Sequence, residues 1–189
     1  DGRIAMVIDG GECEIGLEST VIAVSGNSAN VLRPGAVTPD MLRSAGIAVT
    51  VDEAVTDPAK AGSAPQSPGM KYKHYAPKAE LYLVEGGTAE LIAAARSGGS
   101  LPSATAVMCS DDDTAKFPGF IVLDTGKSDE EYAHRLFSLL RRADELGAER
   151  IYAALPRADG DTLAIYNRII RSSAGKIIRK TTNTEKEVL

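Results

Sequence analysis

The chain has 189 residues, of which 43% are hydrophobic and 25% are charged, a balance that suits a globular protein with an apolar core. Its net charge of −5 gives no basic surplus of the kind that indicates nucleic-acid binding by charge alone. No run of about 18 apolar residues predicts a membrane span, and the first residues show no signal-peptide pattern. Two widely separated cysteines, Cys13 and Cys109, predict neither a disulfide framework nor a zinc site, so we expect a cytoplasmic protein.

The first 51 residues predict four strands and one short helix. β-branched and apolar residues at 4–8, 20–25, 30–35 and 47–51 form runs that Gly or Pro residues bound. Between the last two runs, Thr38 suits an N-cap, Pro39 suits the first helical position, and Gly46 suits the position after the helix. Because the chain opens without Met and directly on a predicted strand, we expect a piece of a longer protein.

Residues 52–78 predict an interdomain linker. Pro, Ala, Gly and Ser dominate this stretch, and neither strand nor helix periodicity continues through it. At roughly 25 residues it is longer than the usual loop within a compact domain, which indicates either a disordered or a functional segment.

Residues 79–180 alternate between predicted strands and helices. Strands are expected at 80–87, 105–110, 120–126 and 150–156, and helices at 88–99, 128–147 and 161–175. Ser128 and Glu131 have the spacing of a capping box at the start of the longest helix, and Gly147 ends it. This alternation predicts a complete α/β domain with a parallel sheet, followed by a polar tail at 181–189.

Two small clusters in the first part are candidate binding groups. Glycines precede a strand that begins with Ser19 and Thr20, and hydroxyl and N–H groups at such a junction can hold a carboxylate or phosphate. A simple hairpin turn is the alternative. Arg33 ends a strand before Pro34 and could grip a phosphate through two parallel hydrogen bonds, or lie solvated on the surface.

A basic and aromatic segment at 67–77 closes the linker. Its cations can donate charge-assisted hydrogen bonds and its tyrosine rings can stack on a base, while prolines stiffen both ends. It could therefore cover an anionic, aromatic ligand, or it could be a linker whose tyrosines pack on a domain surface. The residues concerned are Lys71, Tyr72, Lys73, His74 and Tyr75.

Three further features are weaker. Residues 85–88 lie between a strand and a helix but lack the spaced glycines of a dinucleotide-binding fingerprint. The acidic run 111–113 is expected to start a helix and not to bind metal. His134 lies within an amphipathic helix, and we expect it to be structural.

Three segments together resemble one family. The segments DGG…GLESTVIAV (9–24), VLRPGAVTPDML (31–42) and SPGMKYKHYAPKAEL (67–81) are similar, in order and spacing, to the long form of the YrdC-like threonylcarbamoyl-AMP synthases. The final helix, LAIYNRIIRSSAGKII (163–178), also resembles that family, so the likeness covers nearly the whole chain. It implies that residues 1–51 end a YrdC-like catalytic α/β domain and that residues 79–180 form a smaller Rossmann-like domain.

The resemblance also implies a reaction. Such nucleotidyltransferases convert L-threonine, bicarbonate and ATP with Mg²⁺ into threonylcarbamoyl-AMP and pyrophosphate, and a downstream tRNA threonylcarbamoyl transferase machinery uses that product for N6-threonylcarbamoyladenosine in tRNA. It implies that Ser19 and Thr20 contact threonine and that Arg33 contacts ATP phosphates. Lys71, Tyr72, His74 and Tyr75 would cover the nucleotide. No residue of the small domain matches a catalytic motif.

One departure from the family concerns length. The family's catalytic domain begins about 150–200 residues before the linker, within the usual size of a domain. Neither the family's basic Lys/Arg motif nor its Ser–Ala–Asn segment has a counterpart here, so we expect this piece alone to be inactive. Two alternatives stay open: a non-catalytic nucleotide- or RNA-binding module with weak RNA contact, and a purely structural α/β partner domain.

Overall fold

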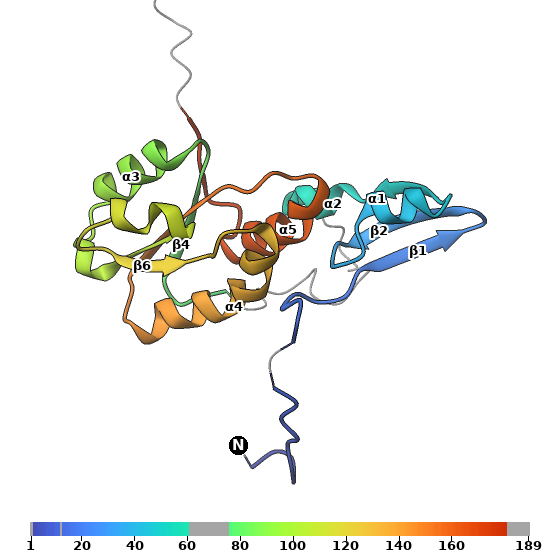
Figure 1. Cartoon of the computed structure of the whole chain (residues 1–189), viewed down its shortest axis with the longest axis horizontal. Coiled ribbons are helices and arrows are strands. Elements are labelled where there is room, and N and C mark those ends of the chain that lie inside the picture. The colour runs from blue at the N-terminus through green and yellow to red at the C-terminus, as the bar shows by residue number, and fades with distance from the viewer. Residues whose placement is uncertain (1, 12, 61–75, 181–189) are drawn as a thin grey trace, which may run out of the picture.

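The structure, a computed structural model, describes residues 2–11, 13–60 and 76–180. A three-stranded sheet lies at one end, with α1 against it, and a larger α/β domain lies at the other (Figure 1). In the small sheet β1 and β2 pair antiparallel through a tight hairpin, and β2 and β3 pair parallel. Its elements are β1 (Val21–Ser25), β2 (Ser28–Arg33), α1 (Pro39–Ser44) and β3 (Ala48–Val51).

The ends of α1 confirm the prediction from sequence. The Thr38 side chain accepts a hydrogen bond from the Met41 backbone N–H at 3.2 Å, and Pro39 occupies the first helical position. Gly46 follows the helix with a φ of 82°, a left-handed conformation that glycine adopts without steric cost. The helix therefore makes the crossover between β2 and β3, which are parallel.

The larger domain has five strands in the order β6-β5-β7-β4-β8, and all of its strand pairs are parallel. This confirms the predicted parallel α/β architecture, and it adds β8, a two-residue strand that the sequence pattern does not reveal. The strands are β4 (Glu80–Val84), β5 (Thr105–Cys109), β6 (Ile121–Asp124), β7 (Arg150–Ala154) and β8 (Ile177–Ile178). The helices are α3 (Thr88–Ser97), α4 (Asp129–Glu145) and α5 (Leu163–Ser172), and the 3₁₀ turns include η3 (Asp111–Lys116) and η4 (Gly160–Thr162).

Helices cover both faces of this sheet. Successive residues of a strand point to opposite faces, and β5 shows the consequence. Ala106 and Met108 pack with residues of α4 and α5, whereas Val107 and Cys109 pack with residues of α3. Among the helices that the structure describes, none is long and apolar enough to cross a membrane.

The N-terminus of α4 has only half of the predicted capping box. Ser128 Oγ accepts from the Glu131 backbone N–H at 3.3 Å, as expected. The Glu131 carboxylate accepts instead from the Lys127 N–H at 3.4 Å and from Arg135 at 2.9 Å. The guanidinium thus competes for the carboxylate that a full capping box would return to the N-cap backbone.

One prediction from sequence is wrong. Residues 4–8 form no strand, and Ile8 is 83% exposed; none of the described strands pairs with this segment, so its backbone groups find no sheet partner. The expected linker starts with regular structure, namely α2 (Glu53–Thr56) and η1 (Pro58–Lys60). Ala54 and Val55 are buried, and α2 lies beside α5 (Figure 1).

Side chains of α5 hold α2 in place. Tyr166 donates to the Thr56 carbonyl at 3.2 Å, and Asn167 donates to the Val55 carbonyl at 2.6 Å. Arg171 donates to the Ala54 carbonyl at 2.7 Å. These contacts satisfy carbonyls that the short helix leaves without an internal partner. The segment that follows the small sheet is therefore held against the larger domain.

Candidate functional site: the Ser19–Arg33 cluster

Residues 16–18 dock the first part of the chain onto the larger domain. A Cβ on Gly16 would lie 2.5 Å from the His134 carbonyl oxygen, and the backbone φ of Gly16 is +70°. Only glycine therefore fits at this close approach. Leu17 packs against the large core cluster, and the Glu18 carboxylate accepts from Arg168 Nε at 2.7 Å. These three residues therefore fix the position of the two that follow them.

Ser19 lies against Arg33 at the end of β2. Arg33 Nε donates to the Ser19 carbonyl oxygen at 3.0 Å, and Arg33 Nη2 donates to Ser19 Oγ at 3.2 Å. Two hydrogen bonds from one planar guanidinium fix the orientation of the serine hydroxyl as well as its position. Residues 14 positions apart in the sequence thus form one polar cluster.

Thr20 and Gly35 complete this cluster. Thr20 Oγ1 donates to the Val37 carbonyl oxygen at 2.8 Å, which ties the start of β1 to the loop after β2. A Cβ on Gly35 would lie 2.4 Å from the Glu18 carbonyl oxygen and 2.5 Å from the Thr20 nitrogen. The absence of a side chain at Gly35 is therefore what lets the two segments meet.

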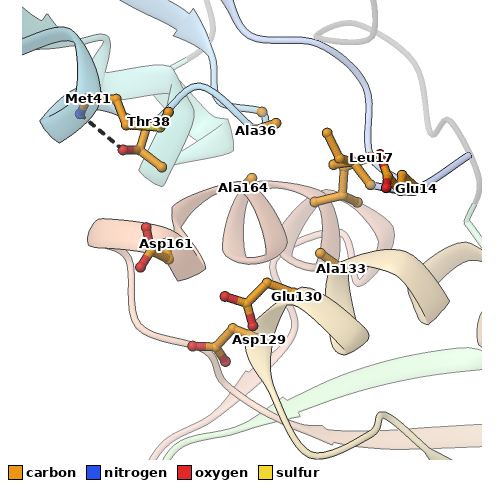
Figure 2. A pocket seen from close by; sticks show the side chains of 12 residues that line it. Glu14, Leu17, Ala36, Thr38, Met41, Asp129, Glu130, Ala133, Asp161 and Ala164 are labelled. Carbon is orange, nitrogen blue, oxygen red and sulfur yellow. Dashed lines mark hydrogen bonds between the residues drawn. The ribbon is translucent and has the colours of Figure 1, made fainter. Parts of the chain in front are cut away.

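A pocket of about 340 Å³ lies between two segments of the first part, residues 14–17 and 35–38, and the larger domain. Figure 2 shows Thr38 and Met41 of the α1 region on one wall and the start of α4 on the other. Leu17, Ala36 and Ala164 contribute apolar surface. Its acidic residues are Glu14, Asp129, Glu130 and Asp161.

The charge of this interdomain pocket argues against an anionic ligand there. A hydrogen bond from Ser128 lowers the pKa of Glu130 below its ordinary value, so this carboxyl is ionised at neutral pH. Neither lysine nor arginine is among the described residues that line the pocket. Carboxylates repel phosphate, so an anion would be favoured at the Ser19–Arg33 cluster and not in this pocket.

The structure brings together Ser19, Thr20 and Arg33. Lys71, Tyr72, His74 and Tyr75 lie outside the described residues. Within the described ranges there is no group of three or more His, Cys, Asp or Glu side chains that could hold a metal ion, so no protein ligands for Mg²⁺ are identified.

The Glu18–Arg168 ion pair is a contact that the sequence does not reveal. Glu18 lies inside the quoted motif and Arg168 lies on a predicted helix, but the sequence gives no sign that residues 150 positions apart would meet. His134, which the sequence predicts to be structural, has its Nδ1 at 3.2 Å from the Glu14 carbonyl oxygen.

The fold and the cluster together define a class of protein. It is a two-part α/β protein in which a three-stranded sheet, with a serine–arginine cluster beside it, is docked onto a Rossmann-like domain with a parallel sheet. Residues 37–174 match the family described as threonylcarbamoyl-AMP synthase, C-terminal domain, and the chain belongs to that family. This match begins within the first part of the chain and extends across α2 into the larger domain.

Relatives and solved structures agree with this assignment. The threonylcarbamoyl-AMP synthase of Bacillus subtilis is 34% identical over 184 residues, which is 95% of this chain and 51% of that protein. The corresponding protein of Pyrococcus abyssi is 34% identical over 185 residues, 94% of this chain and 52% of the relative. The chain therefore spans about half the length of the curated relatives that it matches.

The crystal structure of P. abyssi Sua5 complexed with L-threonine superposes with a TM-score of 0.78 and 32% identity. The match covers 95% of this chain and 52% of that chain. A variant of the same protein, in which a histidine and a neighbouring tyrosine are alanine, gives a TM-score of 0.73 at 32% identity, over 91% of this chain and 49% of that chain.

Proposed function

We propose that this chain is the part of a threonylcarbamoyl-AMP synthase that contributes the Ser19–Arg33 cluster to the active site. The observation that carries the proposal is the pair of hydrogen bonds between Arg33 and Ser19, made by two motifs that the family resemblance assigns to different substrates. Membership of the family and the threonine complex of a structural neighbour support it.

The proposed reaction has two steps. The amine of L-threonine and bicarbonate first form a carbamate with loss of water. A carbamate oxygen then attacks the α-phosphorus of ATP, a P–O bond forms, and pyrophosphate leaves. Both partners in the second step are anions, so the site must offset their repulsion with fixed cations and oriented donors.

Each residue of the cluster has a proposed role in that chemistry. Ser19 Oγ contacts the threonine substrate, and Arg33 contacts the phosphates of ATP. Because Arg33 also orients Ser19, one guanidinium would fix the positions of threonine and ATP relative to each other. The hydroxyl of Thr20 is engaged with Val37, so we propose that Thr20 shapes the threonine site by positioning this loop.

We further propose that Lys71, Tyr72, His74 and Tyr75 cover the bound nucleotide. His74–Tyr75 is the His–Tyr pair of this sequence, since its other histidine, His134, precedes an arginine. A histidine–tyrosine pair is also what was replaced in the P. abyssi variant. Hydrogen bonds from α5 hold α2, which precedes this segment in the sequence, on the larger domain.

The remaining partners are part of the same proposal. They are ATP, bicarbonate, a tRNA threonylcarbamoyl transferase machinery that receives the product, and Mg²⁺, which would arrive with the triphosphate. A cytoplasmic location fits the two free cysteines. The acidic interdomain pocket and the net charge of −5 count against an RNA-binding module as the alternative.

Pyrophosphate release tests this function in a protein that joins this chain to the half of its relatives' length that the match does not cover. We expect release that requires threonine and bicarbonate together, and release of the same rate without threonine would contradict the proposal. The 189-residue chain alone is expected to release none.

A further inference from the structure

A second pocket lies at the carboxyl edge of the parallel sheet, away from the Ser19–Arg33 cluster. It has a volume of about 260 Å³ and is lined by residues that end or follow four strands: Gly87 and Thr88 after β4, Cys109 and Ser110 at β5, Thr125 after β6, and Ala154 at β7. The size is just below the ~300–1,000 Å³ of common ligand pockets, so a compact molecule fits best.

The topology of the sheet makes this edge a place where ligands bind. β5 and β7 are neighbours, and the chain leaves β5 toward β6 on one side but leaves β7 toward β8 on the other. In open α/β sheets, ligands bind beyond the carboxyl ends of the strands where successive connections diverge in this way. The pocket occupies that position, between Cys109 and Ala154.

Two hydroxyl groups in this pocket are available to a ligand. Thr125 is only 7% exposed, and in the described part of the chain its hydroxyl makes no hydrogen bond. The Tyr132 hydroxyl also makes none with described residues, although burial of this ring raises the pKa of its phenol. Neither hydroxyl oxygen is among the buried side-chain atoms that lack a partner in the described part of the chain, so both are open to the pocket and can donate to or accept from a ligand.

Charge limits what that ligand can be. Among the described lining residues Asp113 is the charged group, and hydrogen bonds from Lys116 and Thr88, at 2.5 Å each, lower the pKa of this carboxyl. Where a dinucleotide fold would bind phosphate at the start of α3, the Gly87 N–H already donates to the Glu90 carboxylate at 2.9 Å. Prior occupation of this donor, together with the Asp113 carboxylate, disfavours a phosphate group here.

We propose that this pocket binds a ribonucleoside that carries no phosphate group, with its ribose hydroxyls donating to the remaining lone pairs of the Asp113 and Thr88 oxygens and bonding to the Thr125 hydroxyl. A carboxylate after the second strand of a doubly wound sheet is a suitable acceptor for a ribose diol. The base would lie against the half-buried Tyr132 ring, while Leu91 and Met108, which also line the pocket, are buried beneath it. The site is separate from the proposed synthase chemistry and does not depend on it.

Titration of the ¹⁵N-labelled 189-residue chain with adenosine, followed by NMR, tests the proposal. We expect saturable shifts centred on the amides of Thr88, Ser110 and Thr125. Thr125→Val and Tyr132→Phe should each weaken binding about tenfold, as expected for one lost hydrogen bond at a buried site. Tyr82→Phe is the matched control, because that hydroxyl donates to Glu80 at the opposite edge of the sheet.

Four results would overturn the proposal. They are no saturable shift, shifts confined to residues around Ser19 and Arg33, unchanged affinity in both folded pocket variants, and tighter binding of adenosine 5′-monophosphate than of adenosine at the same amides. The titration needs no threonine, bicarbonate or ATP turnover. Its failure would leave the pyrophosphate-release test unaffected, and the reverse also holds.

Discussion

Glu18 and Arg168 form an ion pair at 2.7 Å across the junction of the two parts of the chain, with the Arg168 side chain 7% exposed and that of Glu18 29% exposed. Arg168 also donates to the side-chain oxygen of Asn167, whose amide holds α2. One helix, α5, therefore contacts both the segment before β1 and the segment after β3. The position of Ser19 is set by this docking, since Ser19 directly follows Glu18.

Removing the charge of Glu18 should destabilise the protein. Glu18→Gln leaves a buried guanidinium without its carboxylate, and we expect a loss of about 1.5–3 kcal/mol in the free energy of unfolding, measured by urea denaturation. Glu145→Gln breaks the Arg142–Glu145 pair on the surface and should cost no more than about 0.5 kcal/mol. Equal losses in the two variants would show that the Glu18–Arg168 pair contributes no more to stability than an exposed ion pair does.

Gly16 and Gly46 allow a matched comparison of backbone strain and contact. Both have positive φ, but only Gly16 has an atom in the way of a Cβ, the His134 carbonyl oxygen at 2.5 Å. Gly46→Ala should cost about 1–2 kcal/mol from backbone strain alone. Gly16→Ala should cost clearly more, because the segment must also lift from α4. Thermal denaturation of the two variants measures the difference, and a smaller loss at Gly16 would contradict the close approach.

Acid should weaken a contact between α3 and the end of the described chain. Hydrogen bonds from Lys180 and from the Gly87 N–H lower the pKa of Glu90 from its ordinary 4.5 to about 2. Because the folded pKa is the lower one, the stabilisation is fully present above about pH 4.5 and is lost as the pH falls toward 2. Melting temperatures across this range should therefore fall less steeply in Glu90→Gln than in the wild type.

Salt provides the control for this pH effect. The Lys180–Glu90 distance is 2.7 Å and both side chains are partly exposed, so about 1 M NaCl should reduce the difference between wild type and Glu90→Gln. Identical pH profiles of the two proteins at low salt would show that Glu90 does not titrate in the expected range.

The two cysteines should differ in reactivity. Burial raises the pKa of the Cys109 thiol to about 11, so little thiolate exists at pH 8, whereas Cys13 is exposed. Alkylation of the native protein should modify Cys13 quickly and Cys109 only on unfolding, as read by mass spectrometry of its peptides. Rapid labelling of Cys109 in a folded Cys13→Ser variant would be inconsistent with this burial.

Local signals in the sequence predict much of the fold. Thr38, Pro39 and Gly46 specify α1, and short unbroken runs of apolar residues specify β4, β5 and β7, because these preferences act over a few neighbouring residues. The strand predicted at residues 4–8 fails for the opposite reason. A strand depends on a neighbour, and no local pattern states whether one is present.

The binding cluster could be predicted only in part. Motifs identify Ser19, Thr20 and Arg33, but the hydrogen bonds that join them depend on the close approach of Gly35 to Thr20. The sequence does not predict the buried helix α2, because Ala54 and Val55 form too short an apolar run to indicate one. Contacts of Glu18 with Arg168 and of Asn167 with Val55 span more than 100 positions and follow from the tertiary fold alone.

The measurement that tests the central claim most directly is the steady-state kinetics of pyrophosphate release by Ser19→Ala and Arg33→Ala in a full-length protein carrying this chain. We predict that Arg33→Ala raises the KM for ATP at least tenfold, since one charge-assisted contact contributes about 1.5–3 kcal/mol. Ser19→Ala should raise mainly the KM for threonine, and Arg43→Ala, which breaks an exposed pair with Asp40, should change neither. Unchanged KM values for both substrates in both cluster variants would contradict the assignment of Ser19 and Arg33 to the active site.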